Sequence, residues 1–476
     1  MAVFQGPATG NLRSTGRGLI VQGQADIRSG RLSEAEIEVN FADMHPPLER
    51  REALVEADRC YFCFDAPCTT ACPTDIDIPG FIQKIRSDNI KGSAKTILSE
   101  NIMGGMCSRV CPTEVLCEEV CVRTTLEDKP VRIGLLQRYA TDAVIQDKLQ
   151  LFRRKQDSGK HVAVVGGGPA SLSCAHRLAT LGHQVTILDG AEKQGGLNEF
   201  GIAAYKTLND FARTEVNYIL AVGGIEVRKG VTLGTDFSLA SLREVYDAVF
   251  LGVGLGGVNE LGLEHDQADG IVDAVEYIAA LRQADNKAEL LVGRKVVVIG
   301  GGMTAIDVAV QSKMLGAEDV TMVYRRGPQQ MGASKFEQNF AKTSGVRIRH
   351  WLAPAALLMN EDRVNGIQFV YTSLDDNGCL QATGERCELE ADVVFKAIGQ
   401  KVLWDALGDT AESIGLEHGR ISVNEQRKTS LADVWAGGDC IQGGEDLTVS
   451  AVQDGKLAAM DIDRFLQQGG DCAPSL

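Results

Sequence analysis

The sequence predicts an α/β protein in which two nested βαβ units follow an α-helical, cysteine-rich domain. A pattern of strand, glycine turn, helix and strand occurs at residues 161–190 and again 134 residues later. Apolar strands that end in glycines recur between the units and after the second one, in YDAVFLGVGLGG, ADVVFKAIGQ and LADVWAGGDC. Eight of the 13 cysteines lie between Cys60 and Cys121, ahead of the first unit.

The bulk composition narrows the functional class. A chain of 476 residues is too long for one ordinary domain, and 44% apolar with 24% charged residues is typical of a globular protein. A net charge of −16 argues against a nucleic-acid or anionic-membrane surface. The N-terminus has no apolar core of a signal peptide, and the apolar runs are too short to span a membrane. We therefore expect a cytoplasmic protein, whose clustered cysteines would more often be metal or redox groups than disulfides.

Changes in composition along the chain suggest where its domains begin and end. The segments RREALVEADR and PGFIQKIRSDNIKGSAKTIL predict short helices between cysteine loops, RRKQDSGK is a charged linker, and DLTVSAVQDGKLAAMDIDRFLQQ predicts a closing amphipathic helix. We expect an N-terminal extension that is flexible or packs on a partner (1–44), a helical domain (45–155), a first nucleotide-binding domain in two parts (156–260 and 397–476), and a second one (261–396).

The first βαβ unit predicts a Rossmann-like dinucleotide site. Gly166 and Gly168 permit the tight turn and the close approach of a pyrophosphate to the helix N-terminus. Ser171 holds the third small position, where Gly or Ala is usual, and is still small enough for the helix to pack on the strand. Asp189 ends the next strand 23 residues after Gly166 and can accept hydrogen bonds from a ribose. A glycine turn without a ligand is the alternative interpretation.

The second βαβ unit differs from the first at the end of its second strand. Gly300, Gly302 and Ala305 fit the G-x-G-x-x-A pattern, but Arg325 and Arg326 stand where an acid would favour a free 2′-hydroxyl. Arginines suit a 2′-phosphate, so the residues favour NADPH over NADH; a solvated strand end is the alternative.

Together, the two units and the late strand ending at Asp439 resemble the flavoproteins with two dinucleotide-binding domains, over residues 160–476. The resemblance implies FAD in the first unit, NAD(P) in the second, and a closing helix whose N-terminus faces the flavin and stabilises its reduced form. The implied FAD residues are Gly166, Gly168, Pro169, Ala170, Asp189, Gly196, Leu197, Gly438, Asp439 and Thr448. The implied NAD(P) residues are Gly300, Gly302, Thr304, Ala305, Arg325, Arg326 and Gly399.

Some of these flavoproteins reduce disulfides with a cysteine pair beside the flavin, and this sequence offers no such pair. Cys174 and Cys440 are isolated, and Cys379 and Cys387 are separated by seven residues in a region of strand and turn. We expect no catalytic side chain beyond the cofactors, so electrons must leave the flavin by another route.

The clustered cysteines offer that route. They follow the patterns C-x2-C-x4-C-x3-C-P from Cys60 and C-x3-C-P-x4-C-x3-C from Cys107. Structural zinc sites usually have two short knuckles, whereas a run of four that closes with Cys-Pro is typical of iron–sulfur proteins with two clusters. The residues favour two [4Fe-4S] clusters over zinc, with disulfides a distant third possibility.

The segments CYFCFDAPCTTACP, CSRVCPTEVLCEEVC and IGLLQRYATD resemble the iron–sulfur region of dihydropyrimidine dehydrogenases. Over residues 48–470 the chain is similar to the separate electron-input subunits of the bacterial enzymes. The resemblance implies Cys60, Cys63, Cys68 and Cys121 as ligands of one cluster and Cys72, Cys111, Cys117 and Gln137 as ligands of the other. It leaves Cys107 as a non-ligand. Met303 and the segment GIAAYKTL depart from the family's usual sequence.

This resemblance implies the activity of an oxidoreductase subunit. NAD(P)H would reduce FAD, and the clusters would pass electrons to an FMN- and iron–sulfur-containing partner subunit that reduces uracil or thymine to the 5,6-dihydro form. Two alternatives remain open: the small subunit of an NAD(P)H-dependent glutamate synthase, whose second cysteine group is more tightly spaced, and a zinc-stabilised flavin-binding scaffold without enzymatic activity.

Overall fold

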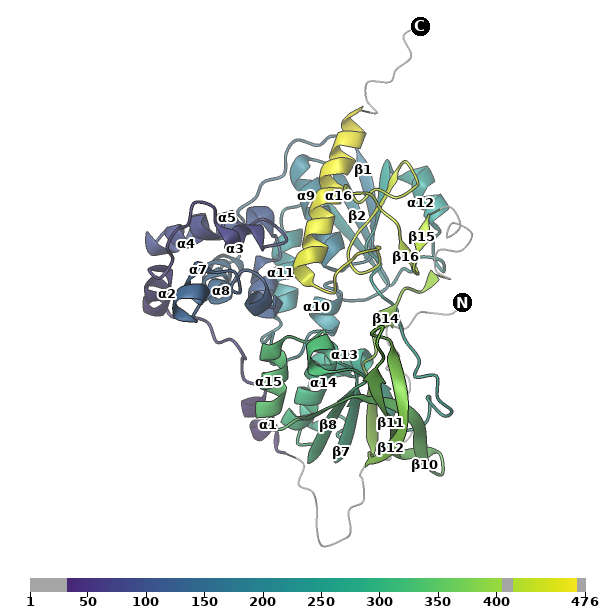
Figure 1. The fold of residues 1–476 in the computed structure, drawn as a ribbon. Coiled ribbons are helices and arrows are strands. Elements are labelled where there is room, and N and C mark those ends of the chain that lie inside the picture. The colour runs from purple at the N-terminus through teal and green to yellow at the C-terminus, as the bar shows by residue number, and fades with distance from the viewer. Residues whose placement is uncertain (1–31, 405–413, 469–476) are drawn as a thin grey trace.

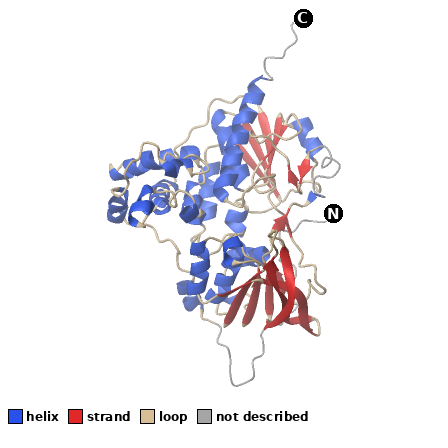
Figure 2. Cartoon of the chain, in the orientation of Figure 1, coloured by secondary structure: helices blue, strands red, loops and turns tan. Residues whose placement is uncertain are grey.

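The computed structural model describes residues 32–404 and 414–468, which form a helical domain beside two lobes built on parallel sheets (Figure 1). Helices make up the whole of the domain at the left of the view, whereas the strands lie in the two lobes (Figure 2). The predicted α/β class, with a helical domain ahead of two Rossmann-like units, is confirmed.

The helical domain consists of short helices separated by the cysteine loops. They are α2 (Arg50–Ala57), α3 (Pro67–Thr70), α4 (Ile78–Arg86), α5 (Ile90–Glu100), α6 (Gly104–Val110), α7 (Val122–Glu127) and α8 (Ile133–Ile145), with a 3₁₀ turn η1 at Thr113–Val115. The predicted helical segment 79–98 is two helices, because Asp88 has a left-handed φ of 60° and Asn89 caps the start of α5. Ile97, Leu98 and Met106 belong to a core that continues into the first lobe, so this domain packs firmly on it.

The first lobe contains a five-stranded parallel sheet in the order β17-β4-β1-β2-β3. Its strands are β1 (His161–Val165), β2 (Gln184–Asp189), β3 (Ile225–Lys229), β4 (Ala248–Leu251) and β17 (Val434–Ala436), and its helices are α9 (Pro169–Leu181), α10 (Leu197–Phe200), α11 (Phe211–Leu220), α12 (Leu239–Val245) and α16 (Thr448–Gln468). The chain order reverses between β1 and β4, and open parallel sheets bind ligands at the carboxyl ends of strands at such a point. A short pair, β15 (Leu416–Glu417) and β16 (Arg420–Ile421), lies beside this sheet.

The closing helix α16 lies along α9, and both helices pack on the strands of this sheet (Figure 1). Gly455 permits the close crossing, since a Cβ there would lie 2.1 Å from the carbonyl oxygen of Ala170.

The second lobe repeats the design with a parallel sheet in the order β6-β13-β7-β8-β9. Its strands are β6 (Ile271–Asp273), β7 (Lys295–Ile299), β8 (Asp319–Tyr324), β9 (Arg347–His350) and β13 (Val393–Lys396), and its helices are α13 (Ala274–Gln283), α14 (Met303–Met314) and α15 (Lys335–Thr343), with 3₁₀ turns η2 (Lys287–Glu289) and η3 (Pro328–Gln330). An antiparallel sheet of β10 (Leu352–Asn360), β11 (Arg363–Leu374) and β12 (Leu380–Glu390) is added to it. The lobes are connected through the antiparallel pair β5 (Gly257–Val258) and β14 (Gln400–Lys401).

The start of the described chain packs on the chain itself. Ser33 caps helix α1 (Glu34–Asn40) with a capping box, and the Asn40 side chain donates to the carbonyl of Met314 at the end of α14. Ile37 and Phe41 join the core of the second lobe. The expectation of a flexible or partner-bound extension is therefore wrong for residues 32–44, and residues 1–31 lie outside the described part.

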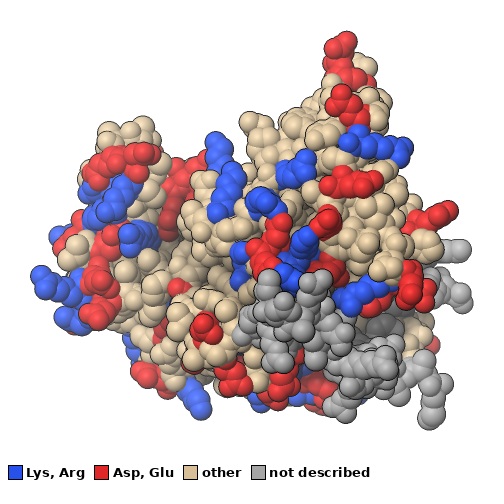
Figure 3. Space-filling model, turned by 90° about the horizontal axis from the view of Figure 1, so that it is seen from below, with Lys and Arg blue, Asp and Glu red and all other residues tan. Residues whose placement is uncertain are grey.

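The surface carries both signs of charge. Acidic and basic side chains are interspersed over the face seen from below (Figure 3), although the whole chain has a net charge of −16. Across residues 32–404 and 414–468, no helix has the length and apolar character needed to cross a bilayer.

Candidate functional site

A cavity of about 310 Å³ opens at the carboxyl ends of the strands in the first lobe. Ligand sites of this size are common at the topological switch point of a parallel sheet. All ten residues expected to bind FAD line it: Gly166, Gly168, Pro169, Ala170, Asp189, Gly196, Leu197, Gly438, Asp439 and Thr448. Four separate chain segments therefore converge on one site.

The glycine turn after β1 leaves no room for side chains where it meets the neighbouring strand's end. Gly166 has a φ of 94°, and a Cβ there would lie 2.4 Å from the carbonyl oxygen of Gly252, so only glycine fits. Gly168 precedes α9, which begins with Pro169, a residue suited to the first helical turn. The fully buried Ser171 contacts Gly252, where a Cβ would lie 2.2 Å from its Oγ. The helix N-terminus is thus open to an anionic pyrophosphate.

Carboxylates occupy the polar positions of the cavity. Asp189 at the end of β2 accepts a hydrogen bond from the backbone N–H of Ala191, and its burial raises its pKa. Burial and the nearby Asp446 raise the pKa of Asp439 to about 7. A ribose or ribityl hydroxyl can donate to such groups, so both positions suit the polyol parts of FAD.

The N-terminus of α16 closes the cavity. The Thr448 hydroxyl lies 2.7 Å from Oδ1 of Asn198, which is buried in α10. This bond fixes the start of a 21-residue helix at the cavity wall. The partial positive charge of the helix N-terminus favours an anionic group at this position.

Helix α14, which follows the second glycine turn, begins at the same cavity, whereas Gly300 and Gly302 are not among the residues that line it. Thr304, together with Met303, lines the same cavity, whereas Ala305 is fully buried beneath the turn. Gly300 needs to be glycine because a Cβ there would lie 2.2 Å from the carbonyl oxygen of Ala397. Gly302 ends the turn as the residue before α14.

The other expected NAD(P) residues lie away from the cavity. Arg325 and Arg326 follow β8 with exposed side chains, and their backbone carbonyls accept bonds from Thr372 and Trp351. Gly399, with a φ of 93°, accepts a backbone bond from Asn259 at the connection between the lobes. The two arginines are thus free to meet a phosphate at the end of β8.

The cysteines separate into two groups. Cys60, Cys63, Cys68 and Cys121 line one small cavity with the apolar side chains of Ile78, Ile82, Val131 and Ile133. Burial raises the pKa of Cys60, and burial together with the Cys60 thiol raises that of Cys68 to about 12. The backbone N–H of Phe62 donates to the Cys60 sulfur at 3.4 Å. Thiols in such surroundings ionise when a metal supplies the positive charge.

A second group forms around Cys111. Burial, followed by the nearby thiols of Cys107, Cys117 and Cys72, raises the pKa of Cys111 well above its usual value. Burial, followed by Glu118 and the thiols of Cys72 and Cys68, raises the pKa of Cys117 well above its usual value. Cys68 lies in α3 and Cys72 follows two residues after the end of this short helix, so α3 connects the two groups. In the described part of the chain, no three acidic, histidine or cysteine side chains converge tightly enough to hold one metal ion. The two groups are rich in cysteine sulfur, the ligand that holds iron–sulfur clusters.

Gln137 is positioned next to this second group by the first turn of α8. The backbone N–H of Gly134 donates to the carboxylate of Glu118, the residue after Cys117, at 2.9 Å. Gln137 follows one turn later on the same face and is buried. Its Nε2 donates to the carbonyl of Gly104 at 2.7 Å, which leaves Oε1 as the atom available to a metal.

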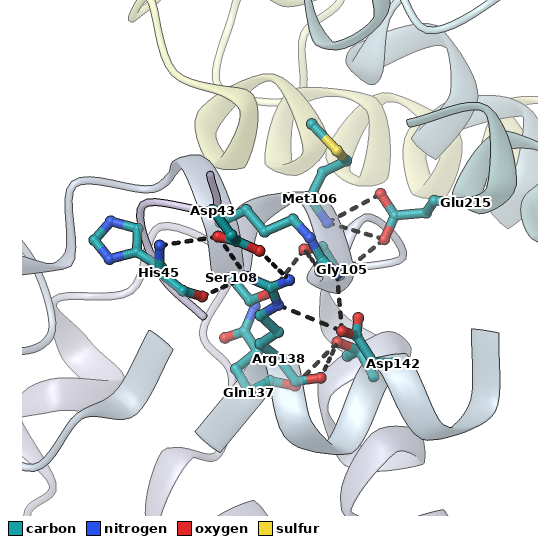
Figure 4. Close-up of polar contacts among 11 residues, drawn as sticks. Asp43, His45, Gly105, Met106, Ser108, Gln137, Arg138, Asp142 and Glu215 are labelled. Atoms are coloured by element: carbon teal, nitrogen blue, oxygen red, sulfur yellow. Dashed lines mark hydrogen bonds and ion pairs between the residues drawn. The ribbon is translucent and has the colours of Figure 1, made fainter. Parts of the chain in front are cut away.

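Buried charges fix helix α6, which ends at Cys111 (Figure 4). Arg109 bonds Asp142 of α8 at 2.8 Å and stacks 3.5 Å above the ring of Phe211. Asp142 also accepts from Arg138, whose guanidinium pairs with Asp43 at 2.7 Å. These contacts fix the end of α6, the helix that leads to Cys111.

Cys111 and Val110 also line the flavin cavity, a position that the spacing of the cysteines does not reveal. Lys206, Asp307 and Gln400 are further lining residues that the sequence analysis missed. Two places where the sequence departs from the family's usual wording, Met303 and the segment GIAAYKTL that contains Lys206, could have pointed to these lining residues.

Comparison with known proteins agrees with this geometry. Residues 37–149 match the model of dihydropyrimidine dehydrogenase domain II, 4Fe-4S cluster, and residues 160–455 match that of pyridine nucleotide-disulphide oxidoreductases. PreT, the NAD-dependent dihydropyrimidine dehydrogenase subunit of Salmonella typhimurium, is 34% identical over 88% of this chain and 96% of its own. The glutamate synthase [NADPH] small chain of Escherichia coli is 33% identical over 90% and 94%.

Solved structures show the same fold at lower identity. FprA of Mycobacterium tuberculosis in complex with NADPH has a TM-score of 0.55 at 19% identity, covering 67% of this chain and 87% of its own. Thioredoxin reductase of Lactococcus lactis has a TM-score of 0.52 at 19% identity, covering 66% and 100%.

The fold and the site thus define an NAD(P)H-dependent oxidoreductase that uses FAD and 4Fe-4S iron–sulfur chemistry, as predicted. The chain belongs to the pyridine nucleotide-disulphide oxidoreductase family, in the branch that contains PreT and the glutamate synthase small chain.

Proposed function

We propose that this chain is the electron-input subunit of a dihydropyrimidine dehydrogenase. It takes electrons from NAD(P)H and delivers them, through two [4Fe-4S] clusters, to an FMN- and iron–sulfur-containing partner subunit that reduces uracil or thymine. The chain by itself does not reduce pyrimidines in this proposal.

One observation carries the electron-transfer part of the proposal. A single cavity is lined by the flavin turn at Gly168, by the nicotinamide-side turn at Thr304, and by Cys111 of the second cysteine group. FAD bound there accepts two electrons from NAD(P)H and can release them one at a time. Input and output groups thus reach the same cofactor from different walls.

The position of Cys111 in the cavity wall supports an order for the two clusters. Cys72, Cys111, Cys117 and Gln137 would hold the cluster next to the flavin, because Cys111 lines its cavity. Cys60, Cys63, Cys68 and Cys121 would hold the outer cluster, and the short helix α3, which contains Cys68 and leads to Cys72, would connect it to the inner one. Replacing one thiolate by the neutral Gln137 removes a negative charge and alters the potential of the inner cluster.

The identity of the partner rests on the relatives and on the cysteine spacing. PreT is named as a subunit of NAD-dependent dihydropyrimidine dehydrogenase. The five residues between Cys111 and Cys117, and the segment IGLLQRYATD around Gln137, favour the pyrimidine enzyme over glutamate synthase.

The test is anaerobic purification of the chain with and without a co-expressed FMN-barrel subunit, followed by assays of NADH and NADPH oxidation with uracil. We expect uracil-dependent turnover only with the partner. Reduction of ferricyanide by the chain alone, without any response of the complex to uracil, would refute the pyrimidine assignment and leave the electron-input role. The partner subunit of glutamate synthase, which carries a glutaminase domain, would then be tested in the same assay.

A further inference from the structure

Lys206 is a buried lysine of the first lobe whose ammonium is held by carboxylates of the second. Its side chain is 8% exposed, and Nζ lies 2.8 Å from Oδ1 of Asp307 and 2.8 Å from Oε1 of Glu337. Lys206 follows α10, whereas Asp307 lies in α14 and Glu337 in α15. The ion pairs therefore join the two nucleotide-binding lobes directly.

These ion pairs lie at the wall of the cavity that is assigned to FAD. Lys206 and Asp307 line the same cavity as Thr304 and Gly168. Asp307 is one turn of α14 beyond Met303, so its carboxylate is attached to the turn that faces the cavity. The hydroxyl of the fully buried Tyr205 donates to Asp307 Oδ1 at 2.9 Å and fixes this carboxylate from a second side.

Holding two lobes together does not require this chemistry. Buried ion pairs lose much of their attraction to desolvation, and apolar side chains of similar volume are often as stabilising. The cluster has one ammonium for two carboxylates, and in the described part of the chain Glu337 Oε2 is buried without a hydrogen-bond partner. What an ionic cluster provides in addition is a specific geometry, because its charges tolerate little displacement.

We propose that Lys206 is a positioning residue for hydride transfer: through Asp307 it holds the first turn of α14, and the dinucleotide bound there, at the distance from the flavin that the reaction needs. This inference rests on the electron-input role of the proposed function, in which hydride would pass from the nicotinamide to the flavin, and Lys206 would take no part in bond exchange. The proposal does not depend on the identity of the electron-accepting partner.

The test follows flavin absorbance at 450 nm after anaerobic mixing with NADPH or NADH. A displacement of about 1 Å between reacting groups costs about 100-fold in rate. We expect K206M to reduce flavin about 10- to 100-fold more slowly at saturating nucleotide, with less than about a threefold change in half-saturating concentration. K206R keeps the charge and should recover most of the rate.

Two further readouts separate positioning from general damage. A primary deuterium isotope effect with C4-deuterated nucleotide should be at least as large in K206M as in the unmodified chain, because hydride transfer becomes the slow step. The content of FAD and iron should not change. K313M makes the same substitution in α14, the helix that carries Asp307; Lys313 donates to the carbonyls of Ala317 and Glu318, and K313M should keep the original rate.

An unchanged rate of flavin reduction in K206M, or an equal loss in K313M, would overturn the proposal. If K206M fails to retain FAD, D307N provides the second test, since it keeps the shape of the side chain and removes the charge that Lys206 holds. The proposal requires D307N to slow flavin reduction as well, and a D307N variant with the original rate would overturn it.

Discussion

Oε1 of Glu215, in helix α11 of the first lobe, lies 2.8 Å from the backbone nitrogen of Gly105 at the start of α6 (Figure 4). The same carboxylate accepts from the backbone N–H of Met106 at 3.2 Å. Glu215 is fully buried, and it satisfies two N–H groups that a helix start leaves without partners. A side chain 110 residues away thus caps the short helix that leads to Cys111.

This carboxylate should make stability depend on pH. Burial raises the pKa of Glu215 to about 8, against the opposing effect of the bonds from Met106 and Gly105. Between the ordinary glutamate value of 4.5 and about 8, the unfolded chain loses the proton while the folded chain keeps it. Stability is therefore fully present below this window and falls as pH rises through it, by at most about 1.4 kcal/mol per pH unit.

The substitution E215Q should abolish that slope, since the amide oxygen still accepts both N–H bonds and carries no proton. We expect the difference in free energy of unfolding between E215Q and the unmodified chain to grow in favour of E215Q up to about pH 8. Denaturant unfolding from pH 5.5 to 8.5 measures it. E244Q, on the exposed surface of α12, controls for net charge, and a constant difference across the range would contradict the assignment.

Replacing Gln137 should change one cluster and leave FAD in place. Q137A removes the oxygen ligand that the proposed function assigns to the inner cluster, so the electron paramagnetic resonance signal and the potential of one cluster should change. Q137E keeps an oxygen and should retain the cluster at an altered potential. Q146A, at an exposed position just beyond α8, is the matched control. Unchanged spectra and potentials of both clusters in Q137A would rule out this ligand.

Cys107 and Cys117 are both buried, yet only Cys117 is a proposed ligand. We expect C117A to lose the iron and acid-labile sulfide of one cluster, whereas C107A should keep the full content of both. Iron and sulfide analysis of anaerobically purified protein measures this directly. Loss of a cluster in C107A would show that the ligand set assigned by resemblance is wrong.

Arg325 and Arg326 should set the preference between the nicotinamide nucleotides. Charge-assisted hydrogen bonds contribute about 1.5–3 kcal/mol, so replacing both by alanine should raise the half-saturating NADPH concentration about tenfold or more. The value for NADH should stay within about twofold. R386A, at an exposed position on β12, controls for the loss of an arginine. Equal effects on both nucleotides would exclude a 2′-phosphate contact.

The sequence was sufficient to predict those parts of the structure that depend on residues close together in the chain. Both βαβ units follow from local periodicity and glycine spacing. Residues after β1, β2 and β17 meet in one cavity because parallel strands bring their carboxyl ends to the same edge. The glycines at 166 and 300 were recognisable because close backbone approach leaves no room for a side chain.

Long-range contacts could not be predicted in this way. Lys206 and Asp307 are about a hundred residues apart, and nothing local indicates that they form an ion pair. The antiparallel sheet β10–β12 was anticipated only as strand and turn, because much of β12 is exposed and lacks a clear apolar alternation. The packing of α1 on α14 likewise depends on a surface that the sequence of residues 32–44 does not contain.

Cys111 and the flavin turn line the same cavity, and this affects both the rate of electron transfer and the side reaction of reduced flavin with dioxygen. In the proposed function, a cluster held by Cys111 would accept electrons from reduced FAD without waiting for an acceptor to diffuse in. Dioxygen, which must diffuse, competes poorly against such a cluster. If Cys111 were replaced and FAD retained, the reduced flavin would no longer pass its electrons on to the cluster. It would then persist longer and react with dioxygen, which would form superoxide or peroxide.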